Sequence, residues 1–158
     1  MTHDGFLKTG DIATRDSEGF YTIVDRKKEL IKYKGFQVPP AELEALLVTN
    51  SRVADAAVIG IFSNEQETEL PRAYIVPAAE LGPFETPDAK VAFEKEIAEW
   101  VKTKVANHKW LRGGVVITDE VPKSPSGKIL RRKLRERVKQ EIDLYQVTGA
   151  PVKAKSKL

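Results

Sequence analysis

A lysine closes a loop of small residues at 122–128, which reads Pro-Lys-Ser-Pro-Ser-Gly-Lys. Gly127 and the small side chains let the backbone approach a ligand closely, and Lys128 offers a compact positive charge to a carboxylate or a phosphate. The segment is not a P-loop, because it lacks the first glycine of that motif and Ile129 replaces the magnesium-binding Ser or Thr. Taken alone, it is more typical of an exposed lysine on a surface turn.

A second group of polar residues lies at 32–37, Lys-Tyr-Lys-Gly-Phe-Gln, just before a predicted helix. Cationic and amide donors beside an accessible glycine backbone suit a phosphate or an adenine ring. The alternative is a strand whose lysines point outward and whose Tyr33 and Phe36 point inward. The segment by itself favours neither interpretation.

The composition excludes several classes of site. The chain has 158 residues, about one domain, with a net charge of +3. It has no cysteine, which excludes disulfides, thiolate zinc sites and cysteine nucleophiles. Two histidines far apart in sequence, His3 and His108, argue against a transition-metal site. No apolar run is long enough for a membrane span. We therefore expect no metal site and no membrane span in this chain.

Positive charge gathers between residues 123 and 139, where Glu136 is the only acid. One interpretation is a free-standing binding module whose basic helix docks on acidic partners or nucleic acid, with strongly salt-dependent affinity. However, no aromatic side chains alternate with the basic ones, and the helices predicted elsewhere contain acids. We expect no dedicated nucleic-acid binding.

Hydrophobic periodicity and turn residues predict an α+β fold: an N-terminal β-hairpin, then a short sheet of about three strands flanked by helices. The expected elements are a hairpin of 6–15 and 20–26 around a turn at 16–19, a helix over 41–47, strands over 53–62 and 70–77, a helix over 88–105, a strand over 115–118 and a helix over 129–142. Residues 143–158 have few apolar side chains and are expected to form a flexible tail.

Four segments occur in a fixed order: Thr-Gly-Asp at 9–11, Asp-Arg-Lys-Lys-Glu-Leu-Ile-Lys-Tyr-Lys-Gly-Phe-Gln at 25–37, Pro-Pro-Ala-Glu-Leu-Glu at 39–44, and the loop 122–128. This set resembles the C-terminal domain of the adenylate-forming (AMP-binding) superfamily, most closely the branch of 4-coumarate–CoA ligases, acyl-CoA synthetases and beetle luciferases. The resemblance covers residues 4 to about 137. It implies a hairpin over 1–26 that leads to a hinge, and a small mobile lid domain over 27–142.

The resemblance implies an acid–thiol ligase with ATP and coenzyme A as co-substrates. A carboxylic acid attacks the α-phosphate of ATP, and coenzyme A then displaces AMP from the acyl-adenylate while the lid rotates between the two steps. The acid pocket, the phosphate loop and Mg²⁺ belong to an N-terminal adenylation domain, the expected partner, so we expect this chain alone to be inactive and Met1 to be either an internal methionine or an artificial start. A luciferase-like monooxygenase is the nearest alternative.

Individual positions match residues of that family. Asp11 and Arg26 match contacts to the ribose of ATP or AMP; for Asp11 the alternative is a residue that caps the hairpin turn. Lys28 matches the hinge and reaches the adenylate. Lys32 and Gln37 match residues that face the adenylate and the pantetheine tunnel in the thioester-forming orientation.

Three further positions complete the implied catalytic and CoA-binding set. Lys34 and Gly35 match a coenzyme A contact, where the missing Cβ of glycine lets the thiol arm pass. Lys128 matches the catalytic lysine that bridges the substrate carboxylate and the α-phosphate during adenylation. A preorganised cation at that place stabilises the charge that develops on the phosphoryl oxygens.

The chain ends in Ser156, Lys157 and Leu158, a tripeptide that the peroxisomal import receptor reads at a free C-terminus. We therefore expect a peroxisomal protein. The alternatives are a basic tail that improves solubility and a cytoplasmic location.

Overall fold

The computed structural model describes residues 1–148, which form two compact units. The first covers Met1–Val121, and the second begins at Pro122. The observed elements confirm the α+β class, with small antiparallel and mixed sheets and three α-helices among the described residues. The domain boundaries expected at residues 26 and 142 stay predictions.

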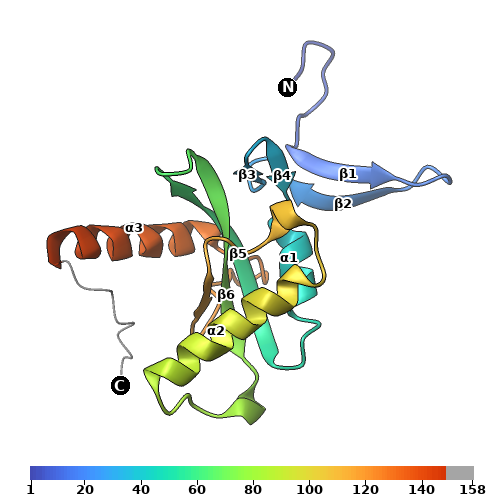
Figure 1. Cartoon of the computed structure of the whole chain (residues 1–158). Helices are drawn as coiled ribbons and strands as arrows, with labels where there is room; N and C mark the ends of the chain where they lie inside the picture. Colours follow the sequence, from blue (N-terminus) through green and yellow to red (C-terminus); the bar gives the residue numbers. More distant parts are fainter. Residues whose placement is uncertain (149–158) are drawn as a thin grey trace. The chain divides into compact units, whose positions relative to one another are not determined.

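The first unit opens with a hairpin of β1 (Asp11–Arg15) and β2 (Tyr21–Arg26), which pair antiparallel (Figure 1). Asp16 orders the turn, since its Oδ1 accepts hydrogen bonds from the backbone N–H groups of Glu18 and Phe20, at 3.0 and 2.9 Å. The predicted hairpin is therefore present. Its first strand begins at Asp11 rather than at residue 6.

A second, shorter hairpin follows, of β3 (Ile31–Tyr33) and β4 (Phe36–Val38). Lys34 and Gly35 form its turn with φ values of 44° and 84°, the left-handed pair of a type I′ turn. The backbone of residues 32–37 thus agrees with the strand alternative, as two short strands joined by a turn. Tyr33 is buried as that interpretation expected, but Phe36 is 53% exposed.

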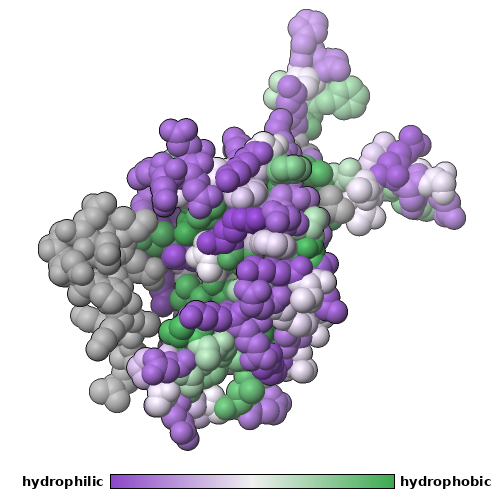
Figure 2. Space-filling model, viewed as in Figure 1, coloured by the Kyte–Doolittle hydropathy of each residue, from purple (hydrophilic) through white to green (hydrophobic). Residues whose placement is uncertain are grey.

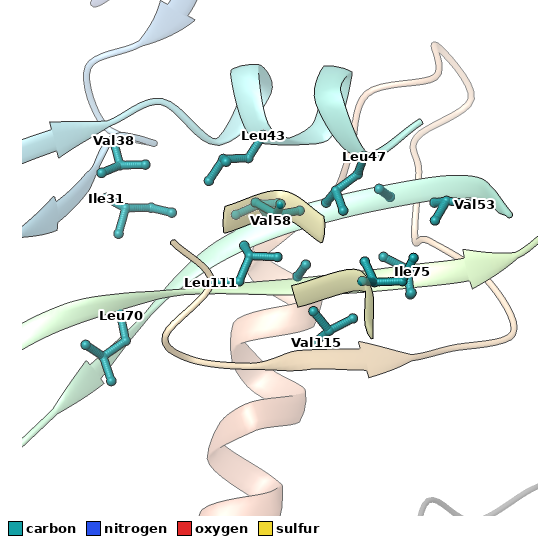
Figure 3. Packing of buried hydrophobic residues seen from close by; sticks show 14 of the residues in the cluster. Ile31, Val38, Leu43, Leu47, Val53, Val58, Leu70, Ile75, Leu111 and Val115 are labelled. Carbon is teal, nitrogen blue, oxygen red and sulfur yellow. The ribbon is translucent and has the colours of Figure 1, made fainter. Parts of the chain in front are cut away.

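Helix α1 (Pro40–Leu47) packs its apolar side chains on the main sheet. Proline occupies its first turn, where a missing N–H costs no hydrogen bond. Leu43 and Leu47 are completely buried, and Figure 3 shows both pointing from the helix toward Val58 on the sheet below. Each such burial is worth about 1.5–3 kcal/mol.

The main sheet has three strands in the order β5 (Val53–Ser63), β6 (Thr68–Pro77) and β7 (Val115–Ile117). The first pair is antiparallel, as a hairpin must be, and β7 returns parallel to β6. This agrees with the predicted sheet of about three strands.

Helix α2 (Pro87–Lys102) separates β6 from β7 in sequence. Its N-cap is Thr86, whose hydroxyl accepts from the backbone N–H of Ala89 at 3.1 Å. The helix ends at Lys102 rather than at residue 105, and the turn after it is closed by backbone hydrogen bonds to residues 99–101. Two short 3-10 helices, η1 (Ala79–Leu81) and η2 (Asn107–Lys109), flank α2.

One hydrophobic cluster holds the first unit together. Its buried members come from α1, α2, the β3–β4 hairpin and all three strands of the main sheet, and Figure 3 shows many of them between α1 and the strands. In the space-filling view, hydrophilic residues cover much of the visible surface with smaller hydrophobic patches between them (Figure 2). The β3–β4 hairpin is thus anchored in the core through Ile31 and Val38, which are 1% and 0% exposed.

The second unit consists of the loop 122–130 and helix α3 (Arg131–Thr148). The helix was expected over 129–142; it begins two residues later and continues to Thr148, into the segment expected to be part of the tail. Among residues 1–148, no helix combines the length and the apolar character that crossing a membrane requires.

Candidate functional site

The loop 122–130 is closed by its own hydrogen bonds. The N–H of Ser124 donates to the carbonyl of Lys128 at 2.8 Å, and the N–H of Leu130 donates to the carbonyl of Pro122, also at 2.8 Å. Gly127 takes φ +77° at the tip, with an N–H bond of 2.9 Å to the carbonyl of Ser124. These bonds give the loop a defined shape.

The side chain of Lys128 is exposed at the end of this loop. Its own N–H donates to the hydroxyl of Ser124 at 3.1 Å, and that hydroxyl lies 2.9 Å from the hydroxyl of Ser126. The backbone of Lys128 is therefore fixed while its ammonium group stays in contact with solvent. This combination suits a cation that must meet an anionic ligand.

The β3–β4 hairpin brings the second predicted group together. Lys32, Lys34, Gly35 and Gln37 are all exposed, and all of them line a groove of about 500 Å³. The groove thus has two cationic side chains, a glycine backbone and an amide on one short hairpin. Its chemistry suits an anionic ligand that carries hydrogen-bonding groups.

The groove also contains residues that sequence reasoning did not find: Phe62, Glu67, Thr68 and Glu69. They come from the end of β5 and the start of β6, with Glu67 in the connecting turn. Neither hydrophobic periodicity nor motif spacing marks these positions as part of a site.

Aromatic and cationic side chains also contact the β3–β4 hairpin, at Tyr33 and Phe36. The guanidinium of Arg112 lies 4.7 Å from the ring centre of Tyr33 and donates to the backbone carbonyl and side-chain oxygen of Asn107, both at 2.6 Å. Phe36 stacks on His108 with 4.6 Å between ring centres. This stacking explains why Phe36 is outside the core. None of the supporting residues was predicted.

Asp11 and Arg26 are brought together by the first hairpin. They are directly opposed in the pairing of β1 with β2, and Oδ1 of Asp11 lies 3.3 Å from Nε of Arg26. The turn-capping alternative for Asp11 is wrong, because Asp16 caps that turn. Two residues that the resemblance assigns to one ribose are therefore neighbours.

Lys28 lies in the turn after β2. The N–H of Glu29 bonds to the carbonyl of Arg26 at 2.9 Å across this turn, and Lys28 is exposed. An exposed turn between the two hairpins is compatible with a pivot. The hinge role of Lys28 stays a prediction.

The remaining predicted positions fall outside the first unit. Lys128 belongs to the second unit, and Ser156, Lys157 and Leu158 lie outside the described residues. Within residues 1–148, no three or more His, Asp or Glu side chains come together in a way that could hold a metal ion.

Arg52 and Glu96, neither of which lines the groove, form an ion pair that shifts the pKa of both groups. Arg52 donates to both carboxylate oxygens of Glu96, at 2.8 and 2.9 Å. The hydrogen bonds from Arg52 lower the pKa of Glu96, and those to Glu96 raise the pKa of Arg52. This ion pair connects the residue just before β5 with α2, so its role is structural.

Comparison with known proteins identifies the family to which this fold belongs. The family described as "AMP-binding enzyme C-terminal domain" matches residues 42–128, more than half of the chain and up to the loop lysine itself. The chain belongs to this family. The resemblance found from the sequence motifs is thereby confirmed.

Several curated proteins are similar in sequence to this chain. A probable 4-coumarate–CoA ligase 1 of Dictyostelium discoideum is 48% identical over 84% of this chain and 22% of its own length. A putative acyl-coenzyme A synthetase of Emericella nidulans is 51% identical over 88% of this chain and 24% of its own. A luciferin 4-monooxygenase of Luciola mingrelica is 47% identical over 89% and 24%. The chain therefore spans about a quarter of the length of these relatives.

A solved structure shows the same fold. The ATP-bound MatB from Rhodopseudomonas palustris superposes with a TM-score of 0.74 at 28% identity, covering 91% of this chain and 26% of that one. Here too the similarity is to one quarter of a larger protein.

Proposed function

We propose that this chain is the C-terminal lid of an ATP-dependent, AMP-forming acyl- or aryl-CoA ligase. The overall reaction converts a carboxylic acid, ATP and coenzyme A into acyl-CoA, AMP and diphosphate. One observation carries the proposal: the family match runs to Lys128, which stands exposed at the tip of a loop with a fixed backbone. The named ligases among its relatives support the choice of reaction.

In the first step Lys128 acts on the acid and ATP. The carboxylate must approach the α-phosphate although both are anions, and charge increases on the phosphoryl oxygens as the new O–P bond forms and the bond to the leaving diphosphate breaks. The ammonium of Lys128 binds both groups and stabilises that charge. Removal of one such preorganised donor costs about 10²–10³ in rate.

In the second step the β3–β4 hairpin replaces the Lys128 loop. Lys32 and Gln37 bind the adenylate and the entering pantetheine chain, and Lys34 and Gly35 contact coenzyme A. Their common position along one groove supports this assignment. The thiol of coenzyme A forms the thioester, and AMP leaves.

The exchange of loops requires the lid to rotate on an N-terminal adenylation domain, its proposed partner. Lys28 is the proposed pivot, and the neighbouring Asp11 and Arg26 bind the ribose hydroxyls. Mg²⁺ is proposed to bind the phosphates on the N-terminal domain.

The direct test is to assay the full-length protein that contains this chain with ATP, coenzyme A and a panel of fatty, cinnamic and other aryl acids. Acid-dependent formation of AMP and a thioester is expected from the full-length protein, and none from the 158-residue chain alone. Turnover by the chain alone, or the absence of any acid-dependent exchange of diphosphate into ATP by the full-length protein, would contradict the proposal.

A second candidate is a luciferase-like monooxygenase, which oxidises its adenylate. The 47% identity to the Luciola mingrelica enzyme favours keeping it. The same full-length protein would then emit light with ATP, oxygen and luciferin. Thioester formation without light emission would exclude this activity.

We further propose a peroxisomal location from the tripeptide Ser156, Lys157 and Leu158. A tagged full-length protein with a free C-terminus is expected to enter peroxisomes, and removal of Leu158 is expected to leave it in the cytoplasm. Import that persists without Leu158 would refute this assignment.

A further inference from the structure

Within residues 1–148, no strand pairs with the outer edge of β3, yet the backbone of this edge is hydrogen-bonded. In the sheet of two strands, β3 pairs with β4 on one side only. Backbone groups on the other side of such a strand need water or side chains as partners. In this protein two side chains from the start of β6 supply them.

Glu69 and Thr68 make three bonds to this edge. The carboxylate Oε2 of Glu69 accepts from the N–H of Lys32 at 2.7 Å. The hydroxyl of Thr68 accepts from the N–H of Lys34 at 2.8 Å and donates to the carbonyl of Lys32 at 2.9 Å. Thr68 is only 6% exposed, so its bonds are protected from water. The side chains of Thr68 and Glu69 thus replace an edge strand for Lys32 and Lys34.

Gly60 provides the room for this arrangement. A Cβ built at Gly60 would lie 3.0 Å from Cγ2 of Ile31, 3.2 Å from Oε2 of Glu69 and 3.3 Å from its Cβ. Glycine therefore lets β3 and the Glu69 carboxylate pack against β5. The close approach places the carboxylate within reach of Lys32.

From this geometry we propose that Thr68 and Glu69 are positioning residues for the thioester-forming step. They fix the backbone at Lys32 and Lys34, and through it the cationic groups that meet coenzyme A. This inference rests on the proposed ligase function and adds residues outside the motifs that define the site. Neither side chain is needed for adenylation, because Lys128 belongs to the other unit and its loop closes through its own bonds.

The expected effect is selective. Loss of an edge bond lets the hairpin shift, and a misplacement of about 1 Å costs on the order of 10²-fold in rate where groups must be aligned. Glu69→Ala and Thr68→Val should therefore lower thioester formation from supplied acyl-adenylate by about ten- to a hundredfold, with a higher KM for coenzyme A. Glu69→Gln keeps an oxygen acceptor and should restore most of the rate.

The experiment measures both half-reactions in the full-length protein. Adenylation is followed by acid-dependent exchange of diphosphate into ATP, and thioester formation by single turnover of supplied acyl-adenylate with coenzyme A. Glu65→Ala is the matched control, since Glu65 is an exposed carboxylate in the turn between β5 and β6. Adenylation by all four variants, and both steps for Glu65→Ala, should stay within about threefold of wild type, as for surface changes away from the reacting groups.

Each outcome decides the matter. Equal loss of both half-reactions in Glu69→Ala, or no loss in either, would overturn the positioning role while leaving the ligase function intact. Wild-type protein without either half-reaction would overturn the ligase function and this inference with it. If Glu69→Ala does not fold by circular dichroism, Thr68→Val and Glu69→Gln provide the same comparison with little change in shape.

Hydrogen exchange in the 158-residue chain supplies an independent readout. The amides of Lys32 and Lys34 should exchange more slowly than those of an open strand edge. Thr68→Val should accelerate Lys34 by about tenfold, which corresponds to the loss of one net hydrogen bond. Unchanged exchange in that variant would show that the bond does not order the hairpin.

Discussion

The β3–β4 hairpin is held by hydrogen bonds to Thr68 and Glu69, which are distant from it in sequence. The loop 122–130, in contrast, is closed by hydrogen bonds between its own residues. Both segments present lysines to solvent. Core packing of Ile31 and Val38, together with hydrogen bonds from side chains of β6, sets the position of the hairpin. Hydrogen bonds within the turn set the shape of the loop.

The position of each lysine therefore depends on a different set of residues. A change at Thr68 or Glu69, at the start of β6, should affect Lys32 without contacting its ammonium group, because these two side chains are hydrogen-bonded to the hairpin backbone. Lys128 should respond to changes within its own loop. The hairpin therefore couples to the stability of the first unit much more strongly than the loop does.

The largest effect is expected from Tyr33→Ala. Tyr33 is 6% exposed and lies under the guanidinium of Arg112, so its removal leaves a cavity and an unsupported hairpin. We expect a loss of about 3–5 kcal/mol in the free energy of unfolding, as for other large aromatic residues in cores. Urea denaturation of the 158-residue chain measures it.

The control is Ser126→Ala in the loop, where less than about 0.5 kcal/mol should be lost because the residue is exposed. Similar losses in the two variants would contradict the proposed difference between the hairpin and the loop.

Gly60→Ala should have an intermediate effect. The new Cβ would crowd Ile31 and the Glu69 carboxylate, and overpacking of this kind costs about 1–3 kcal/mol. We expect a lower urea midpoint and faster exchange of the Lys32 amide. A stable variant with a protected Lys32 amide would show that the space beside Gly60 is not required.

Gly127→Ala tests the loop. A Cβ there meets no atom within 4 Å, so the cost comes from the backbone, which has φ +77°. Alanine in the left-handed region costs about 1–2 kcal/mol. NMR should show shifts at Lys128 and little change at Lys32; large shifts at Lys32 would indicate that the loop is not self-contained.

The smallest effect is expected from Glu96→Gln. Because Arg52 lowers the pKa of Glu96 in the folded chain, the pair stabilises the fold above the ordinary carboxyl pKa, and this contribution is lost as the pH falls through the lowered value. The variant should have a slightly lower Tm than wild type at neutral pH, and the difference should vanish in acid. A Tm difference between variant and wild type that grows in acid would contradict a stabilising role of this ion pair.

The sequence predicted what local patterns encode. The turn residues around Gly19 predicted the first hairpin, the run of Val, Ile and Ala in β5 predicted a buried strand, and the prolines before Leu43 predicted the start of α1. The bonds from Thr68 and Glu69 to β3 were missed because they join side chains to a backbone edge distant in sequence. Such contacts have no periodicity and no motif, so the three-dimensional structure was needed to find them.

Contacts between residues distant in sequence were also missed within the site. The exposure of Lys32 and Lys128 agrees with the sequence, since both lie in short polar segments that contain one glycine each. The outward position of Phe36 was not, because it depends on stacking with His108 of a distant 3-10 helix. The helix bounds differed by a few residues where hydrogen bonding in the end turns decides them.

The most direct test of the account compares Lys128→Ala with Lys32→Ala in the full-length protein, with both half-reactions measured for each. We predict that Lys128→Ala lowers adenylation by about 10²–10³ and spares thioester formation from supplied acyl-adenylate, whereas Lys32→Ala does the opposite. Loss of the same half-reaction in both variants would contradict the division of labour between the two loops.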